Sequence, residues 1–421
     1  MQQERPNQMQ EQIQYQMQES NTNAVASAHI GRSISNIYIC WAVLLLLALA
    51  LSSTTVNAQQ ARIIPRAPDI AATSYVLMDA TTGDILVESN ADIPLPPASL
   101  TKIMTDYVVA SELSSGNISM NDDVFISVKA WQMDGSKMFI QEGTTVRLED
   151  LIYGMVVQSG NDASVALAEH IAGSEEAFAD MMNQHAELLG LTSSYFVNAH
   201  GLPADQHVMS ARDLATLSQA LISRFPENYK IYSTPEFTYN GIRQPNRNSL
   251  LFQDRNVDGM KTGFTDAAGY CLVASATRDD MRLIAVVMGT ASENARAIEA
   301  QKLLTYGFRF YETLELFTGN EVLASNQVWS GKSNSIDIGI QDPVFISIPR
   351  GSDDDLVTDL QINENLKAPI TAGEILGQVT ISLDDQIYYQ GEVIALQTIE
   401  RGSLIKRIMD WLTLFFMNLF S

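Results

Sequence analysis

The stretch Pro96-Pro97-Ala98-Ser99-Leu100-Thr101-Lys102 marks the start of a helix that presents a hydroxyl and an amine together. Apolar residues then recur at helical spacing: Leu100, Ile103, Met104, Tyr107 and Val108. Because Lys102 stands three positions after Ser99, we expect both side chains on one face of this helix, within contact distance. The helix dipole favours a developing alkoxide at Ser99, and burial would lower the pKa of Lys102 toward that of a usable base.

Two further motifs follow in order along the chain. Ser159-Gly160-Asn161 opens a small apolar run, residues 161–168, which predicts a buried helix whose first loop borders a cleft. Lys261-Thr262-Gly263 precedes two β-prone runs, 270–276 and 283–289, which predict a hairpin in a central antiparallel sheet. Together the three motifs provide a nucleophile, a proton acceptor, a second hydroxyl with an amide, and a cation on a strand. This set is suited to acyl transfer through a serine ester.

Each short motif is weak alone, because copies occur elsewhere in the chain. S-x-x-K recurs at Ser403–Lys406, where it opens a C-terminal amphipathic segment without partner motifs. S-x-N recurs at Ser292–Asn294 and at Ser115–Asn117. The copy at Ser115 ends the helix that Ser99 begins, roughly 20 Å away at a rise of about 1.5 Å per residue. The physical context therefore favours Ser99, Lys102 and Ser159.

A purely structural interpretation stays open for each motif. Ser99 would cap a helix with a solvated lysine one turn later, and Ser159 with Asn161 would cap the next helix. Lys261 would be an ordinary lysine on an edge strand. The presence of all three motifs in one order favours the catalytic interpretation over these alternatives.

The motifs and their order resemble those of penicillin-binding proteins and serine β-lactamases. The resemblance is strongest to the low-molecular-weight D-alanyl-D-alanine carboxypeptidases, and it runs from about Thr73 to the C-terminus. It implies an α/β (α+β) serine transpeptidase-like domain over residues 59–312, built from an antiparallel sheet and a helical block. Residues 313–400 have short β-like runs and no helical stretch, which predicts a small all-β, sandwich-like domain.

The local patterns agree with this architecture. A β-hairpin is expected over 74–88, strands return over 236–289, and a helix over 291–308 closes the catalytic domain. The spacing predicts helices over 99–113, 149–157, 161–172, 174–190 and 210–224. In the second domain, β-like runs are expected at 321–323, 337–340, 343–348, 356–362, 375–382 and 386–395.

The chemistry that follows is a serine-type D-Ala-D-Ala carboxypeptidase acting on peptidoglycan stem peptides. Ser99 would attack the carbonyl of the penultimate D-alanine, and Lys102 would take its proton. Ser159, helped by Lys261, would return a proton to the departing amine. Asn161 would hydrogen-bond the substrate amide and position Lys102. The reaction needs no metal and no organic cofactor, and β-lactam antibiotics would acylate the same serine.

The resemblance adds further substrate-binding residues. It implies that the backbone N–H groups of Ser99 and Phe264 form the oxyanion hole. It also implies that the strand edge at Thr262 and Gly263 pairs with the peptide substrate. Arg296 is a candidate for the cation that binds the terminal carboxylate, and its alternative role is a surface salt bridge with Glu293 or Glu299.

Two other functions remain open. A β-lactamase of class A needs a glutamate in an E-x-x-L-N pattern, and the nearest match, Glu187–Gly190, lacks the asparagine. The middle motif is also S-G-N where those lactamases favour S-D-N. The second alternative is a non-catalytic wall-binding or scaffold protein of the same fold. The sequence does not separate carboxypeptidase from endopeptidase or transpeptidase activity.

Other residues near the motifs favour structural roles. No G-x-S-x-G or H-E-x-x-H pattern occurs, so a triad hydrolase or a zinc peptidase is poorly supported. His200 lies in an H-G-L turn that is expected to border the cleft, and pairing with His207 around a metal is disfavoured. Asp162 and Asp266 follow two of the motifs and are expected to be cap or turn residues, with tuning of a lysine as the alternative.

Charge and the N-terminus indicate the compartment. The chain has 421 residues and a formal net charge of −23, which excludes nucleic acid as a favoured partner. Residues 37–51 are apolar and are followed by Val56-Asn57-Ala58, which predicts a signal peptide over 1–58 that is too short for a comfortable membrane span. Cys40 would leave with it, and Cys271 is expected to be a core residue. The enzyme is therefore expected to be exported.

The C-terminal segment, 401–421, predicts an amphipathic helix. Its apolar side carries Leu404, Ile405, Ile408, Trp411, Leu412, Phe415, Phe416 and Leu419, and its polar side Lys406, Asp410 and Thr413. An aromatic-rich apolar face beside a thin polar one is typical of an interfacial membrane helix. The alternative is a terminal helix that docks onto the β domain. The family resemblance favours a peripheral anchor on the periplasmic face of the inner membrane.

Overall fold

The computed structural model describes residues 64–420, and of residues 418–420 only the backbone. The predicted signal peptide, 1–58, lies outside the described residues. The part of the chain that carries the three motifs is built on one antiparallel sheet with strand order β2-β1-β9-β8-β7. Its strands are β1 (Ser74–Asp79), β2 (Ile85–Ser89), β7 (Val257–Thr265), β8 (Gly269–Arg278) and β9 (Met281–Thr290).

Two predictions about this sheet are confirmed. β8 and β9 pair as an antiparallel hairpin, with Arg278 opposite Met281 across the charged turn. β7, which carries Lys261-Thr262-Gly263, pairs only with β8 and so forms an edge of the sheet. The K-T-G motif therefore lies where one side of a strand is free to meet another chain segment.

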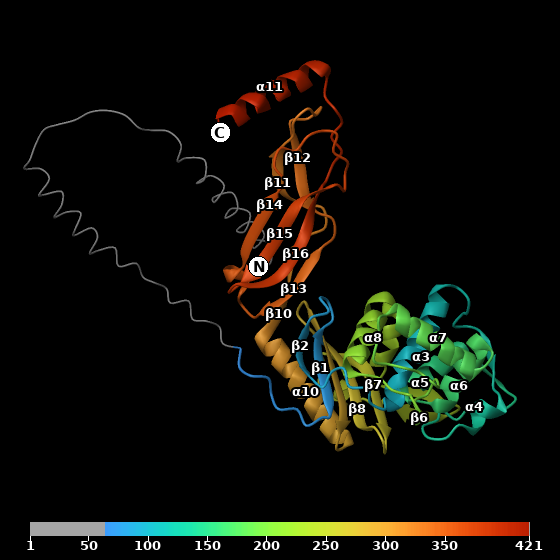
Figure 1. Cartoon of the computed structure of the whole chain (residues 1–421). Helices are drawn as coiled ribbons and strands as arrows, with labels where there is room; N and C mark the ends of the chain where they lie inside the picture. The colour runs from blue at the N-terminus through green and yellow to red at the C-terminus, as the bar shows by residue number, and fades with distance from the viewer. Residues whose placement is uncertain (1–63, 421) are drawn as a thin grey trace, which may run out of the picture. The chain divides into compact units, whose positions relative to one another are not determined.

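A helical block covers one face of the sheet (Figure 1). It contains η1 (Ala98–Thr101), α3 (Lys102–Ser114), α4 (Val128–Gln132), α5 (Leu148–Val157), α6 (Asn161–Ala172), α7 (Glu175–Leu188), α8 (Ala211–Arg224), α9 (Pro226–Tyr229) and η2 (Lys230–Ser233). The short turn η3 (Ser249–Phe252) instead contributes Leu250 to the apolar core on the other face of the sheet. Two short hairpins accompany it: β3 (Asp123–Phe125) with β4 (Thr145–Arg147), and β5 (Glu236–Tyr239) with β6 (Ile242–Pro245). The five longer helices match the predicted ranges within two residues except at the start of α3, which begins three residues later than predicted. α4 and the first hairpin were not predicted.

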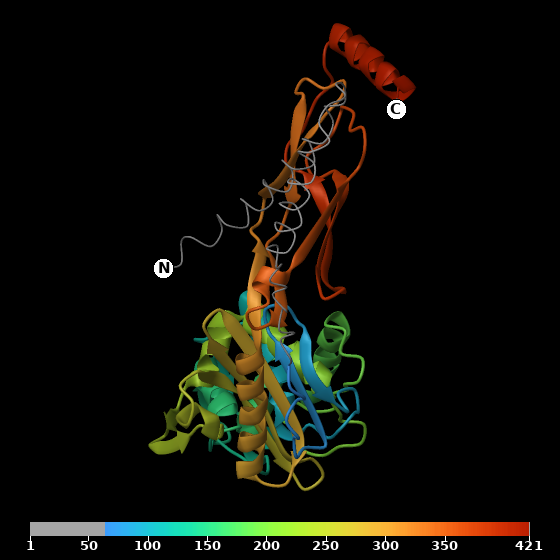
Figure 2. The ribbon, with the colours of Figure 1, turned by 90° about the vertical axis from the view of Figure 1, so that its left-hand side faces the viewer.

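The other face of the sheet is covered by α10 (Glu293–Phe310), which crosses the strands in Figure 2. Because side chains alternate along a strand, β8 contributes to two cores. Cys271 and Val273 pack with the helical block, whereas Leu272 and Ala274 pack with α10. Burial on both faces explains why these runs are apolar throughout, and it confirms that Cys271 is a core residue.

The C-terminal domain is all β, as predicted. It pairs β10 (Tyr311–Phe317) with β13 (Val344–Pro349). A five-stranded sheet in the order β11-β12-β16-β15-β14 completes it: β11 (Glu321–Gln327), β12 (Ser335–Ile340), β14 (Val357–Ile362), β15 (Ile375–Leu383) and β16 (Gln386–Ala395). Ile346 of β13 and Ile338 of β12 share one apolar core, so the two sheets pack together. A single turn, η4 (Asp353–Asp355), interrupts these strands.

The chain ends in α11 (Leu404–Phe420), the predicted amphipathic helix. Its polar side contacts the β domain: the carboxylate of Asp410 accepts from the backbone N–H of Ser330 at 2.7 Å, and Lys406 donates to Asn334. Its apolar side is exposed, with Trp411 at 61% and Phe415 at 51%. The helix therefore does not dock through its apolar face. Within residues 64–420, no helix combines the length and apolar character that crossing a membrane requires.

Candidate active site

Ser99 lies in the 3-10 turn η1, immediately before α3 begins at Lys102. The sequence predicted a regular helix from Ser99, so the helix starts three residues later than expected. Ala98 sits in the left-handed region at φ +49°, which is unusual for a residue with a side chain. The Thr101 hydroxyl donates to the Ala98 carbonyl at 2.8 Å and closes this strained turn. The turn leaves Ser99 half-buried at the wall of a cleft.

Lys102 is buried and meets three oxygen atoms. Its Nζ lies 3.0 Å from Ser99 Oγ, 2.7 Å from Asn161 Oδ1 and 2.7 Å from the His200 carbonyl oxygen. Burial lowers the pKa of Lys102 to about 7, although the charge of Asp162 opposes the shift. A large fraction of Lys102 is therefore a free amine near neutral pH, in contact with the hydroxyl it would deprotonate.

The second motif places Asn161 beside this pair. Asn161 donates from Nδ2 to the Asp134 carbonyl at 2.6 Å, which fixes its amide with Oδ1 toward Lys102. Ser159 has φ +68°, and its buried hydroxyl has no hydrogen-bond partner in the part of the chain that the structure describes. An unsatisfied buried hydroxyl costs roughly 1–3 kcal/mol.

Asp162 organises the loop that faces Ser99. Its carboxylate accepts from the backbone N–H groups of Met138 at 2.9 Å, Phe139 at 2.9 Å and Ile140 at 3.3 Å. This role agrees with the predicted cap or turn function. Its negative charge also opposes the lowering of the Lys102 pKa by burial. The alternative role of Asp162, tuning of a lysine, is therefore partly right as well.

The third motif brings Lys261 to the same region from β7. Lys261 is 2% exposed, and its Nζ donates to the Thr262 carbonyl at 3.3 Å. Burial lowers the pKa of Lys261 well below its usual value, and the nearby charges of Lys102, Arg247 and Arg296 act in the same direction. Thr262 is also buried, whereas the Phe264 side chain is 47% exposed.

Two glycines allow the backbones around Ser99 to approach closely. A Cβ on Gly263 would lie 2.9 Å from the Pro97 carbonyl oxygen, and one on Gly201 would lie 1.9 Å from the Ala98 carbonyl oxygen. Gly201 also has φ +87°, which favours glycine. Gly263 was expected to admit the substrate backbone. In the structure it lets β7 pack against the turn that carries the nucleophile.

Ser99, Asn161, Gly201 and Phe264 border a cleft of about 380 Å³, whereas the predicted site residues Lys102, Ser159, Lys261, Thr262 and Gly263 are not among its lining residues. It is lined by Ser99, Gly135, Ser136, Lys137, Phe139, Gln158, Asn161, Gly201, Leu202, Arg247, Phe264 and Thr265. None of these lining residues is acidic, and Lys137 and Arg247 are cations. The cleft is therefore suited to a negatively charged ligand. Arg247 was not singled out from the sequence, since no motif surrounds it.

Arg296 lies on α10, beside the K-T-G strand. One guanidinium nitrogen is 3.4 Å from the Gly263 carbonyl oxygen, and another is 2.9 Å from the Glu293 carboxylate. Each predicted role of Arg296 is thus matched by one contact. The ion pair with Glu293 fits the salt-bridge role, and the contact with Gly263 brings the guanidinium to the strand edge, as the carboxylate-binding role requires. Arg296 is buried and is absent from the cleft lining given above.

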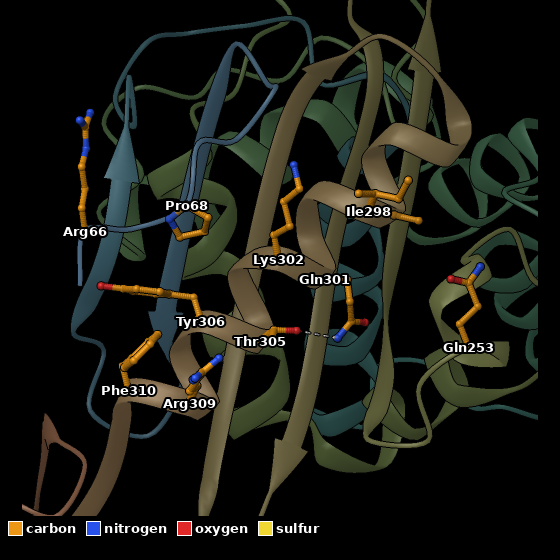
Figure 3. Close-up of a pocket in the computed structure, with 11 residues that line it drawn as sticks. Arg66, Pro68, Gln253, Ile298, Gln301, Lys302, Thr305, Tyr306, Arg309 and Phe310 are labelled. Atoms are coloured by element: carbon orange, nitrogen blue, oxygen red, sulfur yellow. Dashed lines mark hydrogen bonds between the residues drawn. The ribbon is translucent and has the colours of Figure 1, made fainter. Parts of the chain in front are cut away.

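Other parts of the molecule offer less chemistry. Figure 3 shows a second hollow of about 550 Å³ beside α10, where Gln301 contacts Thr305 and none of the lining residues belongs to the three motifs. His207 accepts from the Val197 N–H and contacts the Thr101 hydroxyl, which leaves its ring committed to the fold. Over residues 64–420 there is no group of three acidic, histidine or cysteine side chains that could hold a metal ion.

The site combines a lysine on an edge strand, a serine in a strained turn and a buried lysine that contacts this serine. This combination defines a serine acyl-transfer site of the penicillin-recognising class. Comparison with known proteins agrees. Residues 61–292 match the family model described as D-alanyl-D-alanine carboxypeptidase, and residues 311–401 match that of the penicillin-binding protein 5 C-terminal domain. The chain belongs to the D-alanyl-D-alanine carboxypeptidase family.

Individual relatives support the same assignment. The chain is 43% identical over 366 residues to the D-alanyl-D-alanine carboxypeptidase DacA of Escherichia coli K12, covering 85% of this chain and 91% of that protein. The crystal structure of penicillin-binding protein 5 from Haemophilus influenzae matches with a TM-score of 0.77 at 42% identity, over 80% of this chain and 100% of that one. Penicillin-binding protein D2 of Listeria monocytogenes, in its ampicillin-bound form, matches with a TM-score of 0.54 at 32% identity, over 58% of this chain and 100% of that one.

Proposed function

We propose that Ser99 and Lys102 carry out the serine-type D-Ala-D-Ala carboxypeptidase reaction of this family on peptidoglycan stem peptides. Neutral Lys102 takes the Ser99 proton as Oγ attacks the carbonyl of the penultimate D-alanine. The backbone N–H groups of Ser99 and Phe264 bind the developing oxyanion. The C–N bond to the terminal D-alanine then breaks, leaving an ester on Ser99.

The departing amine must receive a proton. The unpartnered hydroxyl of Ser159 is available for this transfer, and Lys261 assists it. Asn161 holds Lys102 and hydrogen-bonds the substrate amide, while the edge at Thr262 and Gly263 aligns the peptide. The proton held by Lys102 restores the Ser159 hydroxyl, so the amine is neutral again. Water then hydrolyses the ester: Lys102 takes a proton from the water, and the released Ser99 oxygen takes it back as the shortened peptide leaves. β-Lactam antibiotics follow the same path to a stable ester on Ser99.

The observation that carries this proposal is the position of the buried Lys102 amine, 3.0 Å from the hydroxyl of Ser99, which lines a cleft without acidic lining residues. The test is release of free D-alanine from a soluble pentapeptide that ends in D-Ala-D-Ala. We expect steady release, inhibited by penicillin in proportion to covalent labelling. Absence of release from a protein that is folded and labelled by penicillin would contradict the assigned activity.

The β-lactamase alternative is less well supported. Glu187, the nearest candidate for a deacylating base, is exposed at the end of α7 and is not among the residues that line the cleft. Relatives that share about 40% identity are named carboxypeptidases. Rapid turnover of penicillin by the protein would favour the lactamase instead.

Arg296 provides a prediction about substrate recognition. We expect the guanidinium of Arg296 to stabilise the terminal carboxylate of the substrate. It reaches the carbonyl oxygen of Gly263, on the edge strand beside which the leaving D-alanine would lie. Arg296→Ala should lower kcat/KM by an amount that corresponds to the loss of about 1.5–3 kcal/mol of transition-state stabilisation, as for loss of a charge-assisted hydrogen bond. The measurement compares peptides with a free and an amidated terminal D-alanine. The loss should shrink sharply for the amide, and equal losses would assign Arg296 to the fold.

We also propose that the enzyme is exported and that α11 anchors it to the periplasmic face of the inner membrane. The polar contacts at Asp410 and Lys406 leave the opposite side of the helix, including Trp411, Phe415 and Phe416, exposed. Large apolar side chains aligned on one exposed helix face are typical of insertion into a membrane interface. The anchor is peripheral, since the helix is too short to cross.

Deleting residues 403–421 tests the anchor. The truncated protein should move from the membrane fraction to the soluble fraction and keep its activity on soluble peptides. High salt should release little of the full-length protein, because Lys406, Arg407 and Asp410 sum to a net charge of only about one and apolar burial dominates. A truncated protein that still pellets with membranes would exclude α11 as the anchor.

A further inference from the structure

The amine of Lys102 has a third contact that the reaction above does not use. Its Nζ donates to the backbone carbonyl of His200 at 2.7 Å, as short as its contact with Asn161. This carbonyl belongs to the turn 198–202, which packs on the strained turn of Ser99 through Gly201. The position of the carbonyl therefore bears directly on where the base lies.

The turn is held from behind by a buried carboxylate, Glu175, in the first turn of α7. Glu175 Oε1 accepts from the backbone N–H of Ala199 at 3.1 Å and lies 3.1 Å from Nε2 of the His200 ring. The side chain of Glu175 is 8% exposed and that of His200 is 7% exposed. Two consecutive residues of the turn are thus tied to one carboxylate in a dry environment, where such bonds are strong.

The hydrogen bonds also fix the tautomer of the histidine. Nδ1 of His200 accepts from the Leu202 N–H at 3.0 Å, so the proton is assigned to Nε2, which donates to Glu175. Burial lowers the pKa of His200, so the ring is neutral near pH 7. For Glu175, burial opposes ionisation, but the hydrogen bonds from His200, Ala199 and Lys129 lower its pKa to about 2. The pair is a carboxylate that orients a neutral imidazole.

We infer that Glu175 is a positioning residue for the catalytic base: it holds the turn 198–202 so that the His200 carbonyl meets Lys102. The inference rests on the proposed role of Lys102 as base. Without this anchor the turn relaxes, Lys102 loses one of three acceptors, and its amine moves away from Ser99. Misplacement of a reacting group by about 1 Å can cost on the order of 100-fold in rate.

The test uses the full-length protein and acylation by a chromogenic β-lactam, with peptide hydrolysis as a second assay. Glu175→Ala should lower the second-order acylation rate by about 10–100-fold. Glu175→Gln should retain most of the rate, because an amide oxygen still accepts from Ala199 and His200. Glu176→Ala is the matched control: it removes the same charge from the next residue, whose side chain is 77% exposed, and should act like wild type.

The pH profile separates positioning from a general effect on folding. Because a hydrogen bond to the charged form favours that form, weakening the contact with the His200 carbonyl should lower the pKa of Lys102. The acid limb of the acylation rate should move to lower pH in Glu175→Ala and in His200→Ala. The other titratable groups that face Lys102 are Asp162 on α6, Lys261 on β7 and His207, and all three are unchanged in both variants.

The possible results are distinct. A wild-type rate in Glu175→Ala overturns the inference. A slower rate with an unmoved acid limb and a lowered thermal midpoint also overturns it, since Glu175 would then only stabilise the fold. If the Lys102→Ala variant is acylated at the wild-type rate, the proposed base is wrong. This result does not depend on Glu175, so failure of the proposed function is distinguishable from failure of the inference.

Discussion

Ser99→Ala is expected to abolish both the covalent penicillin adduct and the release of D-alanine. Without the hydroxyl there is no atom to form the ester, because the other hydroxyl of η1, that of Thr101, is buried and hydrogen-bonded to the Ala98 carbonyl. Removing a serine nucleophile from a hydrolase lowers kcat by about 10⁶-fold. The measurement is intact mass after incubation with penicillin, followed by peptide mapping of the labelled residue.

Two serines provide matched controls. Ser115 and Ser403 lie in the copies of the motifs that we assigned to chance, at the end of α3 and just before α11. The variants Ser115→Ala and Ser403→Ala should form the penicillin adduct on Ser99 at the wild-type rate. An adduct that maps to any serine other than Ser99 would overturn the assignment of the site.

Local pattern was sufficient to predict most of the elements that carry this site. The five longer helices and the β8–β9 hairpin follow from hydrophobic period, because each buries a regular face. The edge position of β7 was expected from the family resemblance, and the strand order agrees. The start of α3 was misjudged at Ser99. The apolar spacing begins at Leu100, but packing against Gly201 and Gly263 keeps residues 98–101 in a tighter turn.

Contacts between distant segments were not predictable in the same way. Glu175 and His200 are 25 positions apart, and each is unremarkable in its own stretch of sequence. Arg247 enters the cleft from a loop that has no periodic pattern. The double role of Asp162 depends on a loop more than twenty residues earlier in the chain. Such roles arise only when the fold brings separate elements together, so the sequence reveals the residues but not the partnerships.

Lys102 provides the second large prediction. Lys102→Ala should lower the acylation rate by about 10²–10⁴-fold, the usual contribution of a general base. Lys102→Arg should not restore the rate, because a guanidinium remains protonated at any pH where the enzyme is folded. The matched control is Lys230→Ala, which removes an exposed lysine on η2 that is not among the residues lining the cleft and should retain acylation.

The pH dependence of acylation tests the same base independently. Lys102 acts only when unprotonated, and its pKa is lowered to about 7 by burial. The rate should therefore rise about tenfold per pH unit below this value and level off above it. A carboxylate base would instead place the rise near pH 4, where Asp and Glu usually titrate. No carboxylate lines the cleft, so a rise near neutral pH assigns the proton transfer to the buried amine, and a flat profile down to pH 5 would contradict that assignment.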